Sequence, residues 1–202
     1  APSSARRRLY GSRHLDGGLN IHQSDPVGQR CRQKGGSIEP SDHALGRSRG
    51  GLTTKIHLLC DRHGFPITFS LSAGQRADST QLTGLLEKVR LPGRSGRPRK
   101  RSRYIVADKG YDSDALRHYC TRYGMRPIIP RRRMYRRPRP GLPHQFDRPK
   151  YRQRNVVERL FGWLKEKRRL NTRYDKLASS FKAMVTLACI ERCMRADFSD
   201  RT

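Results

Sequence analysis

Residues 104–129, YIVADKGYDSDALRHYCTRYGMRPII, predict a strand, a helix and a second strand in succession. The run Tyr104–Ala107 is short and apolar, as in a buried strand, and Asp108 follows at its carboxyl end. We expect a helix over residues 112–123 and the next strand over residues 126–129. A strand, a helix and a strand in this order form a parallel βαβ unit, so the stretch predicts an α/β fold.

The segment before this unit predicts a β-hairpin followed by a helix. Residues 54–60 and 65–71 have strand composition and are joined by a tight turn. Residues 78–89 carry apolar side chains at helical spacing. A weaker strand signal lies in HLDGGLNIHQ, residues 14–23, where two glycines interrupt the apolar positions. The expected helix caps are Asp78 or Ser79, and Asp112 or Ser113.

The C-terminal part predicts two more helices, over residues 155–170 and 179–195. In Tyr151–Lys165, YRQRNVVERLFGWLK, a helical period of about 100° per residue separates a polar sector from an apolar stripe. The polar sector holds Tyr151, Arg154, Glu158 and Lys165, and the stripe holds Val157, Leu160, Phe161 and Leu164. By periodicity alone, the polar sector is a solvated face with ion pairs worth about 0.2–0.5 kcal/mol each.

Positive charge dominates the composition. Among 202 residues, 45 are Lys or Arg and 17 are Asp or Glu, giving a net charge of +28. Such a charge opposes compaction unless an anionic partner neutralises it, so we expect double-stranded DNA as the partner, bound in a salt-sensitive way. A membrane surface or a ribosomal site would use the same charge.

Two features argue against membrane and secreted classes. No apolar run approaches the roughly 20 residues that span a bilayer, and APSSARRRLY at the N-terminus leads into no apolar signal segment. The five cysteines are odd in number and their spacing suggests neither a disulfide framework nor a zinc site. We therefore expect a cytoplasmic protein without a membrane partner.

The domain organisation is expected to be simple. Residues 1–14 form a basic arm or a fragment boundary, residues 15–197 form one domain, and residues 198–202 are a tail. Within the domain, residues 24–51 and 131–150 are rich in Arg, Gly, Ser and Pro and are expected to be basic loops.

The order Tyr, two residues, Arg, three residues, Glu, six residues, Lys resembles the signature of a group of bacterial insertion-sequence transposases with an Asp-Asp-Glu (DDE) triad. The phrases GRSRGGLTTKIH, GQRAD and ADKGYDSDALR extend the resemblance over most of the chain. It implies an RNase H-like mixed sheet flanked by helices, and metal-dependent cleavage and strand transfer of transposon-end DNA. It also implies a homodimer or larger synaptic complex, acting at the bacterial nucleoid.

By this resemblance, Asp16, Asp108 and Glu158 are the catalytic residues and the metal ligands. Carboxylates suit the task because two Mg²⁺ ions, or Mn²⁺ as a substitute, need hard oxygen ligands during phosphoryl transfer. Each of two aspartates also has a purely structural alternative, because Asp108 could cap a strand and Asp16 could form a turn. The residues expected to contact or position DNA are Tyr151, Arg154, Lys165, Lys109, Arg131, Arg132 and Arg133.

Two other function classes remain open from the sequence. Residues 1–14 do not resemble the helix-turn-helix expected at the N-terminus of a full-length transposase. The chain could therefore be an inactive or truncated remnant that acts only as a DNA-binding protein. The other alternative is a simple RNase H-like nuclease, which would cleave without strand transfer.

Overall fold

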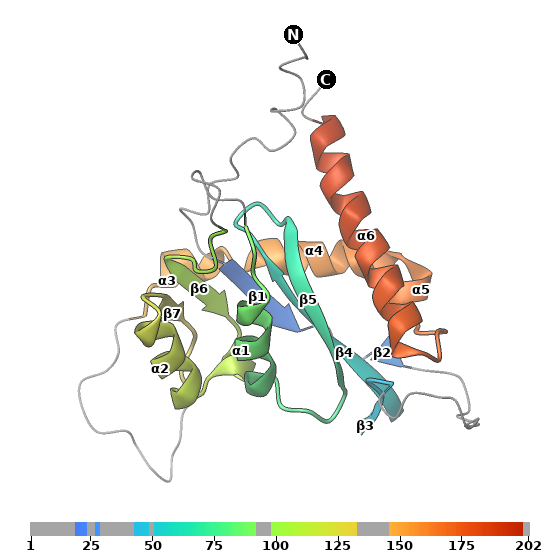
Figure 1. The fold of residues 1–202 in the computed structure, drawn as a ribbon, viewed down its shortest axis with the longest axis horizontal. Helices are drawn as coiled ribbons and strands as arrows, with labels where there is room; N and C mark the ends of the chain where they lie inside the picture. Colours follow the sequence, from blue (N-terminus) through green and yellow to red (C-terminus); the bar gives the residue numbers. More distant parts are fainter. Residues whose placement is uncertain are drawn as a thin grey trace.

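A mixed sheet forms the centre of the molecule. The computed structural model describes residues 19–23, 27–28, 43–48, 51–91, 98–132 and 146–199. The sheet spans, in spatial order, β5 (Pro66–Ala73), β4 (Gly51–Cys60), β1 (Leu19–Gln23), β6 (Tyr104–Ala107) and β7 (Arg126–Ile128). Strands β1, β6 and β7 are parallel, whereas β4 is antiparallel to both of its neighbours β1 and β5 (Figure 1).

The predicted hairpin is formed by β4 and β5. Their pairing runs from Thr54↔Ala73 to Cys60↔Pro66. Both strands are longer than the sequence predicts, because β4 already begins at Gly51 and β5 continues to Ala73. Asp61 closes the turn, because its Oδ1 accepts hydrogen bonds from the backbone N–H groups of His63 and Phe65, each at 2.9 Å. Gly64 follows with a φ of 84°, a conformation that favours glycine.

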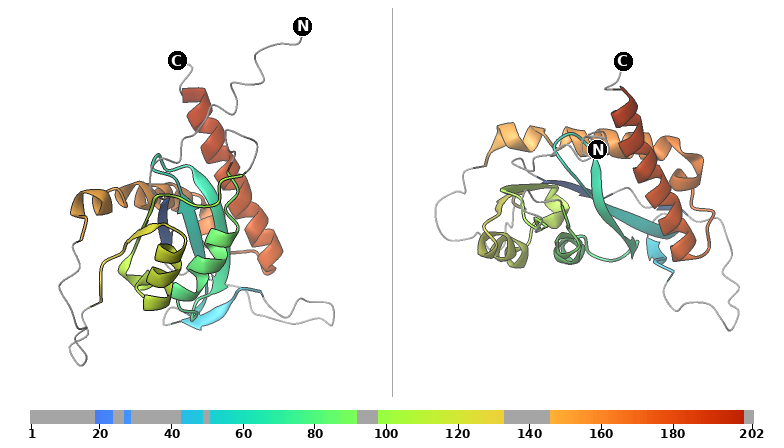
Figure 2. Two further views of the ribbon diagram at one scale, coloured as in Figure 1. Left: turned by 60° about the vertical axis from the view of Figure 1, so that its left-hand side comes forward. Right: turned by 45° about the horizontal axis from the view of Figure 1, so that its top comes forward.

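Helices cover both faces of the sheet (Figure 2). One face packs against α1 (Ser79–Glu87) and α2 (Asp114–Arg122), and the other against α4 (Asn155–Glu166), α5 (Arg168–Asn171) and α6 (Ala178–Ser199). Alternation along β4 separates the two cores, since Leu59 packs with Leu82 and Ile105 whereas Leu58 packs with Phe161 and Phe181. The molecule is thus a three-layer mixed α/β structure.

The βαβ unit is confirmed, with β6 over the predicted residues and α2 and β7 within one or two residues of theirs. Ser113 is the cap of α2, because its Oγ accepts from the backbone N–H of Leu116 at 3.2 Å. Asp78 is the N-cap residue of α1, as expected, but its side chain makes no capping hydrogen bond and pairs with Lys55. Of the two residues expected to cap α2, Ser113 does so and Asp112 pairs with Arg117 instead.

The two regions expected to be loops contain regular structure. Short strands β2 (Val27–Gly28) and β3 (Gly46–Ser48) both pair with the first half of β4. Helix α3 (Arg148–Arg152) begins inside residues 131–150, where Asp147 caps it by accepting from the backbone N–H of Lys150 at 3.1 Å. Composition missed these elements because strand pairing and capping, rather than apolar periodicity, stabilise them.

The helix expected over residues 155–170 is divided. Helix α4 ends at Glu166, Lys167 is extended with a ψ of 105°, and α5 begins at Arg168. The final helix, α6, is 22 residues long, and its C-terminal half extends beyond the sheet (Figure 1). Among the described residues, no helix is both long and apolar enough to cross a bilayer.

Candidate active site

Asp108 is the first residue after β6 and its carboxylate lies on the side of the sheet that carries α4. Ile105 and Ala107 face the core beneath α1 and α2, so alternation directs residue 108 to the opposite face. Its Oδ1 accepts a hydrogen bond from the backbone N–H of Lys109 at 2.7 Å. The side chain remains 45% exposed, which leaves the carboxylate accessible to a ligand.

Glu158 lies in the first turn of α4. The apolar stripe of this helix, Val157, Leu160, Phe161 and Leu164, is buried against the sheet as predicted. Glu158 therefore points away from the core, and its side chain is 43% exposed.

Arg154 lies between the two carboxylates. Its Nη2 is 2.6 Å from Oε1 of Glu158, and its Nη1 is 4.0 Å from Oδ1 of Asp108. A strand end and a helix, 50 residues apart in sequence, thus converge on one guanidinium.

Tyr151 does not share a continuous helix with Glu158, contrary to the sequence prediction. Tyr151 belongs to α3, and residues 153 and 154 form a tight turn before α4. Because residues three apart nearly eclipse in such a turn, Arg154 still lies over the Tyr151 ring, 5.5 Å from its centroid. The ring of Phe146 packs against the Tyr151 ring, with 5.0 Å between the two ring centroids. Burial raises the pKa of Tyr151, so the phenol stays neutral beside the cation at physiological pH.

The other predicted DNA contacts divide into two sets. The first set is exposed. Lys109 follows Asp108 directly, Arg131 lies just after β7, and Lys165 lies on α4 about two turns beyond Glu158. Arg132 is also exposed, but its guanidinium donates to the backbone carbonyls of Lys109 and Gly110, each at 3.1 Å. Arg133 lies outside the described residues.

Asp16 also lies outside the described residues. The nearest described position, Leu19, is paired with Ile105 in the parallel register of β1 and β6, and Ile21 is paired with Ala107. No group of three or more Asp, Glu, His or Cys side chains that could hold a metal occurs among the described residues. Of the predicted triad, the structure brings together Asp108 and Glu158, which both approach Arg154.

A buried polar network on the side of the sheet that carries α1 and α2 was missed by the sequence analysis. His57 on β4 shares hydrogen bonds with Tyr111 Oη at 2.9 Å and with Ser72 Oγ at 2.8 Å. Burial lowers the pKa of His57 to about 4, so the ring is neutral at physiological pH. The signal was present in the sequence, because His57 and Tyr111 belong to the quoted phrases TKIH and DKGY.

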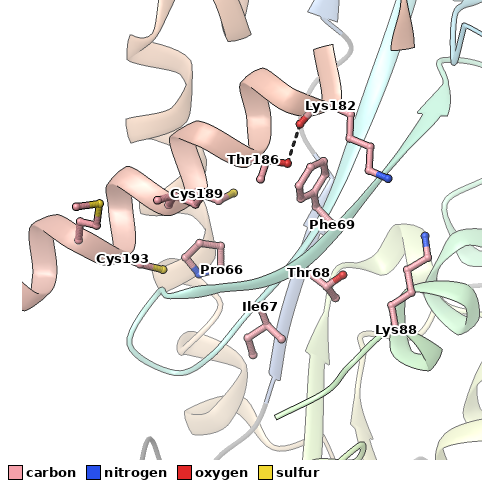
Figure 3. Close-up of a pocket in the computed structure, with 11 residues that line it drawn as sticks. Pro66, Ile67, Thr68, Phe69, Lys88, Lys182, Thr186, Cys189 and Cys193 are labelled. Carbon is pink, nitrogen blue, oxygen red and sulfur yellow. Dashed lines mark hydrogen bonds between the residues drawn. The ribbon is translucent and has the colours of Figure 1, made fainter. Parts of the chain in front are cut away.

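Apart from this site, a groove lies between β5 and α6 (Figure 3). Its volume is about 490 Å³, and its walls include Pro66, Phe69, Cys189 and Met194, with Lys88 and Lys182 at one end. The lining contains no carboxylate, so this groove offers no carboxylate ligand to a divalent metal.

The donor set around Arg154 fits a divalent metal in chemical type. Asp108 and Glu158 offer partly exposed carboxylate oxygens, which are the ligands that Mg²⁺ and Mn²⁺ prefer. The guanidinium that now lies between them shows that a positive charge is accommodated at this position.

Comparison with known proteins assigns the chain to a family. The model of the family described as Transposase DDE domain matches residues 27–190. The chain belongs to this family. Transposases of this family typically use divalent metal ions, and the resemblance to an insertion-sequence DDE transposase is confirmed.

Two curated relatives carry the same description as insertion-sequence transposases. The chain is 34% identical over 148 residues to a protein described as a transposase for element IS402 of Burkholderia cepacia, covering 73% of this chain and 64% of that protein. It is 27% identical over 138 residues to one described for element IS6501 of Brucella ovis, covering 68% of this chain and 95% of the relative. The match thus spans less than two thirds of the length of the IS402 transposase.

A solved structure, the Mos1 strand transfer complex, also resembles the chain. The identity is 16% and the TM-score is 0.30, with 60% of this chain and 37% of that chain covered. A likeness of this size carries no weight for the details of the DDE site.

Proposed function

We propose that this chain is the catalytic domain of an insertion-sequence transposase, which binds transposon-end DNA and carries out metal-dependent strand cleavage and strand transfer. Membership of the transposase DDE domain family supports this proposal. The observation that carries it is the convergence of Asp108 and Glu158 on Arg154.

In this proposal Asp108 and Glu158, with Asp16 as the third carboxylate, hold two Mg²⁺ ions or Mn²⁺ in their place. The bound ions would activate a water or a 3′-hydroxyl and stabilise the leaving oxygen of an in-line phosphoryl transfer. The carboxylates contribute negative charge and oxygen ligands at a position that solvent and a DNA strand can reach.

Arg154 has two roles in this proposal. Without metal, it compensates the charges of Asp108 and Glu158, which would otherwise repel each other at close range. Metal held by Asp108 and Glu158 would supply that compensation, which would leave the planar guanidinium fork of Arg154 to bind a phosphate. The aromatic ring of Tyr151 lies against the guanidinium of Arg154 and limits the positions that the guanidinium can take.

The strand order supports an RNase H-like fold. The sequence of β5, β4, β1, β6 and β7 across the sheet combines an antiparallel hairpin with three parallel strands. We further propose that residues 15–197 form this domain, that the signature Tyr151, Arg154, Glu158 and Lys165 defines its transposase subgroup, and that two copies act together on paired DNA ends.

A nicking and strand-transfer assay with Mn²⁺ tests the proposal. Asp108→Asn and Glu158→Gln should each abolish both reactions, whereas Glu166→Gln, an exposed acid farther along α4, should retain them. Cleavage without strand transfer would indicate a nuclease. Salt-sensitive DNA binding that is unaffected by metal and by both substitutions would contradict the catalytic proposal and favour a DNA-binding remnant. Asp16→Asn decides separately whether Asp16 is the third ligand.

A further inference from the structure

The orientation of Asp108 depends on the short turn that follows it. Residues Lys109–Tyr111 form one turn of 3₁₀ helix, η2, in which Tyr111 N–H donates to Asp108 O at 3.0 Å and Asp112 N–H donates to Lys109 O at 3.1 Å. The Lys109 N–H in turn donates to the Asp108 carboxylate. A shift of this turn would therefore move the carboxylate.

Arg132 holds this turn from outside. Its Nε donates to Lys109 O and its Nη2 donates to Gly110 O, each at 3.1 Å. A guanidinium presents these two donors in a fixed fork, so one side chain fixes two consecutive peptide groups. A lysine has a single ammonium at the end of a flexible stem and cannot reproduce the fork.

Asp112 fixes Arg132 in turn. The backbone N–H of Arg132 donates to Asp112 Oδ2 at 2.7 Å, while Arg117 donates to Asp112 Oδ1 from Nε at 3.0 Å and from Nη2 at 2.7 Å. Asp112 is buried, with a side chain only 2% exposed, and Arg117 also donates to Ile129 O at 2.8 Å. Charge-assisted bonds at a buried site are strong, so the connection between α2, the turn and the exit of β7 is rigid.

The inner side of the turn is equally confined. Asp78, paired with Lys55 at 3.0 Å, lies so close to Gly110 that a Cβ on residue 110 would be 3.0 Å from Asp78 Oδ2. Tyr111 is held by His57 below. The turn therefore has little room to move inward, and in the part of the chain that the structure describes Arg132 holds it from the outer side.

We propose that Arg132 is a positioning residue for Asp108, with Asp112 and Arg117 as its support. It acts by fixing the Lys109–Tyr111 turn, beyond any contribution of its charge to DNA binding. This inference rests on the proposed function, because it assigns Arg132 a role in presenting Asp108 to metal.

Hydrogen exchange by mass spectrometry tests the structural part without requiring catalysis. Arg131→Ala is the matched control, because Arg131 is a neighbouring exposed arginine of equal charge, whereas the hydrogen bonds to the carbonyls of the turn come from Arg132. Arg132→Ala should accelerate exchange of the amides of residues 111 and 112 by roughly fivefold or more, as expected for loss of hydrogen bonds worth about 1 kcal/mol each. Arg131→Ala should leave this exchange unchanged. Equal exchange in the two variants would overturn the proposal.

Mn²⁺ affinity, measured by electron paramagnetic resonance titration, tests the link to the carboxylate. Arg132→Ala and Arg132→Lys should both weaken Mn²⁺ binding several-fold relative to Arg131→Ala. DNA affinity should fall by similar factors in the two alanine variants. Full rescue of exchange and Mn²⁺ affinity by Arg132→Lys would show that charge alone matters and would overturn the proposal. A wild type that binds no Mn²⁺ would instead refute the proposed function, while the exchange comparison would still decide whether Arg132 fixes the turn.

Discussion

Arg154 and Glu158 form an ion pair across one turn at the start of α4, with Nη2 2.6 Å from Oε1. In an exposed helix such a pair contributes only about 0.3–0.5 kcal/mol. Here the same guanidinium also approaches Asp108. The pair therefore matters more for holding the two carboxylates of the candidate site together than for the free energy of unfolding.

Arg154→Ala should therefore impair activity far more than folding. We expect metal-dependent nicking to fall about 10²-fold or more, as when a preorganised donor to a reacting group is removed. Arg152→Ala removes an exposed arginine two positions earlier and serves as the control for charge. Similar losses in both variants would show that Arg154 contributes only to the general positive field.

Mg²⁺ should stabilise the wild-type chain against heat. A ligand at ten times its Kd that binds only the folded state adds about 1.4 kcal/mol to the free energy of unfolding. The increase in Tm should be absent in Asp108→Asn and present in Glu166→Gln. Stabilisation that persists in Asp108→Asn would locate the metal elsewhere.

Acidification should destabilise the protein through His57. Its pKa is about 4 in the folded chain, where burial disfavours the cation, against 6.5 for an ordinary histidine. Between these values the unfolded state binds more protons, so the free energy of unfolding falls as the pH is lowered through this window and is fully recovered above pH 6.5. The maximal effect is about 3 kcal/mol.

Urea denaturation at several pH values measures this effect. His57→Gln should lower stability at neutral pH but flatten the acid dependence, whereas the same substitution at exposed His118 should leave the dependence as it is. An unchanged slope in His57→Gln would assign the acid sensitivity to other groups.

Arg173 should be a major contributor to stability. It is 0% exposed and donates to Thr54 Oγ1, to His43 O at 2.9 Å and to Lys176 O at 3.0 Å. Arg173→Met leaves these buried acceptors without their donor and should cost about 3 kcal/mol or more. Arg169→Met breaks the ion pair between a 58% exposed arginine and Asp175, whose side chain is 8% exposed, and should cost clearly less than Arg173→Met because only this one pair is lost. Chemical denaturation of both variants makes the comparison, and equal losses would contradict it.

DNA binding should depend steeply on salt, because the net charge is +28. If about six to ten phosphates are contacted, the affinity should fall about 10³- to 10⁵-fold between roughly 50 and 200 mM salt. Fluorescence anisotropy with a labelled duplex measures the slope. A nearly flat dependence would exclude phosphate contact as the main source of affinity.

Local rules predicted a large part of this protein. The strand Tyr104–Ala107 and the acid after it follow from a short apolar run, and the buried stripe of α4 follows from helical spacing. These two features depend on residues within a few positions of each other, where strand alternation and helical periodicity apply. The resemblance carried by the signature spacing and the quoted phrases identified the transposase family correctly.

The tertiary structure decided the arrangement of the site. Arg154 meets Asp108 because α4 packs on β1, the neighbour of β6 in the sheet, and Arg132 reaches the turn after Asp108 because β7 lies beside β6. Asp112, expected as a helix cap, instead became a buried partner of Arg117 and Arg132. Periodicity could not reveal these contacts, because an arginine makes the same local pattern whether it faces solvent, a phosphate or a carbonyl. Only the folded chain brings the distant acceptors within hydrogen-bonding distance.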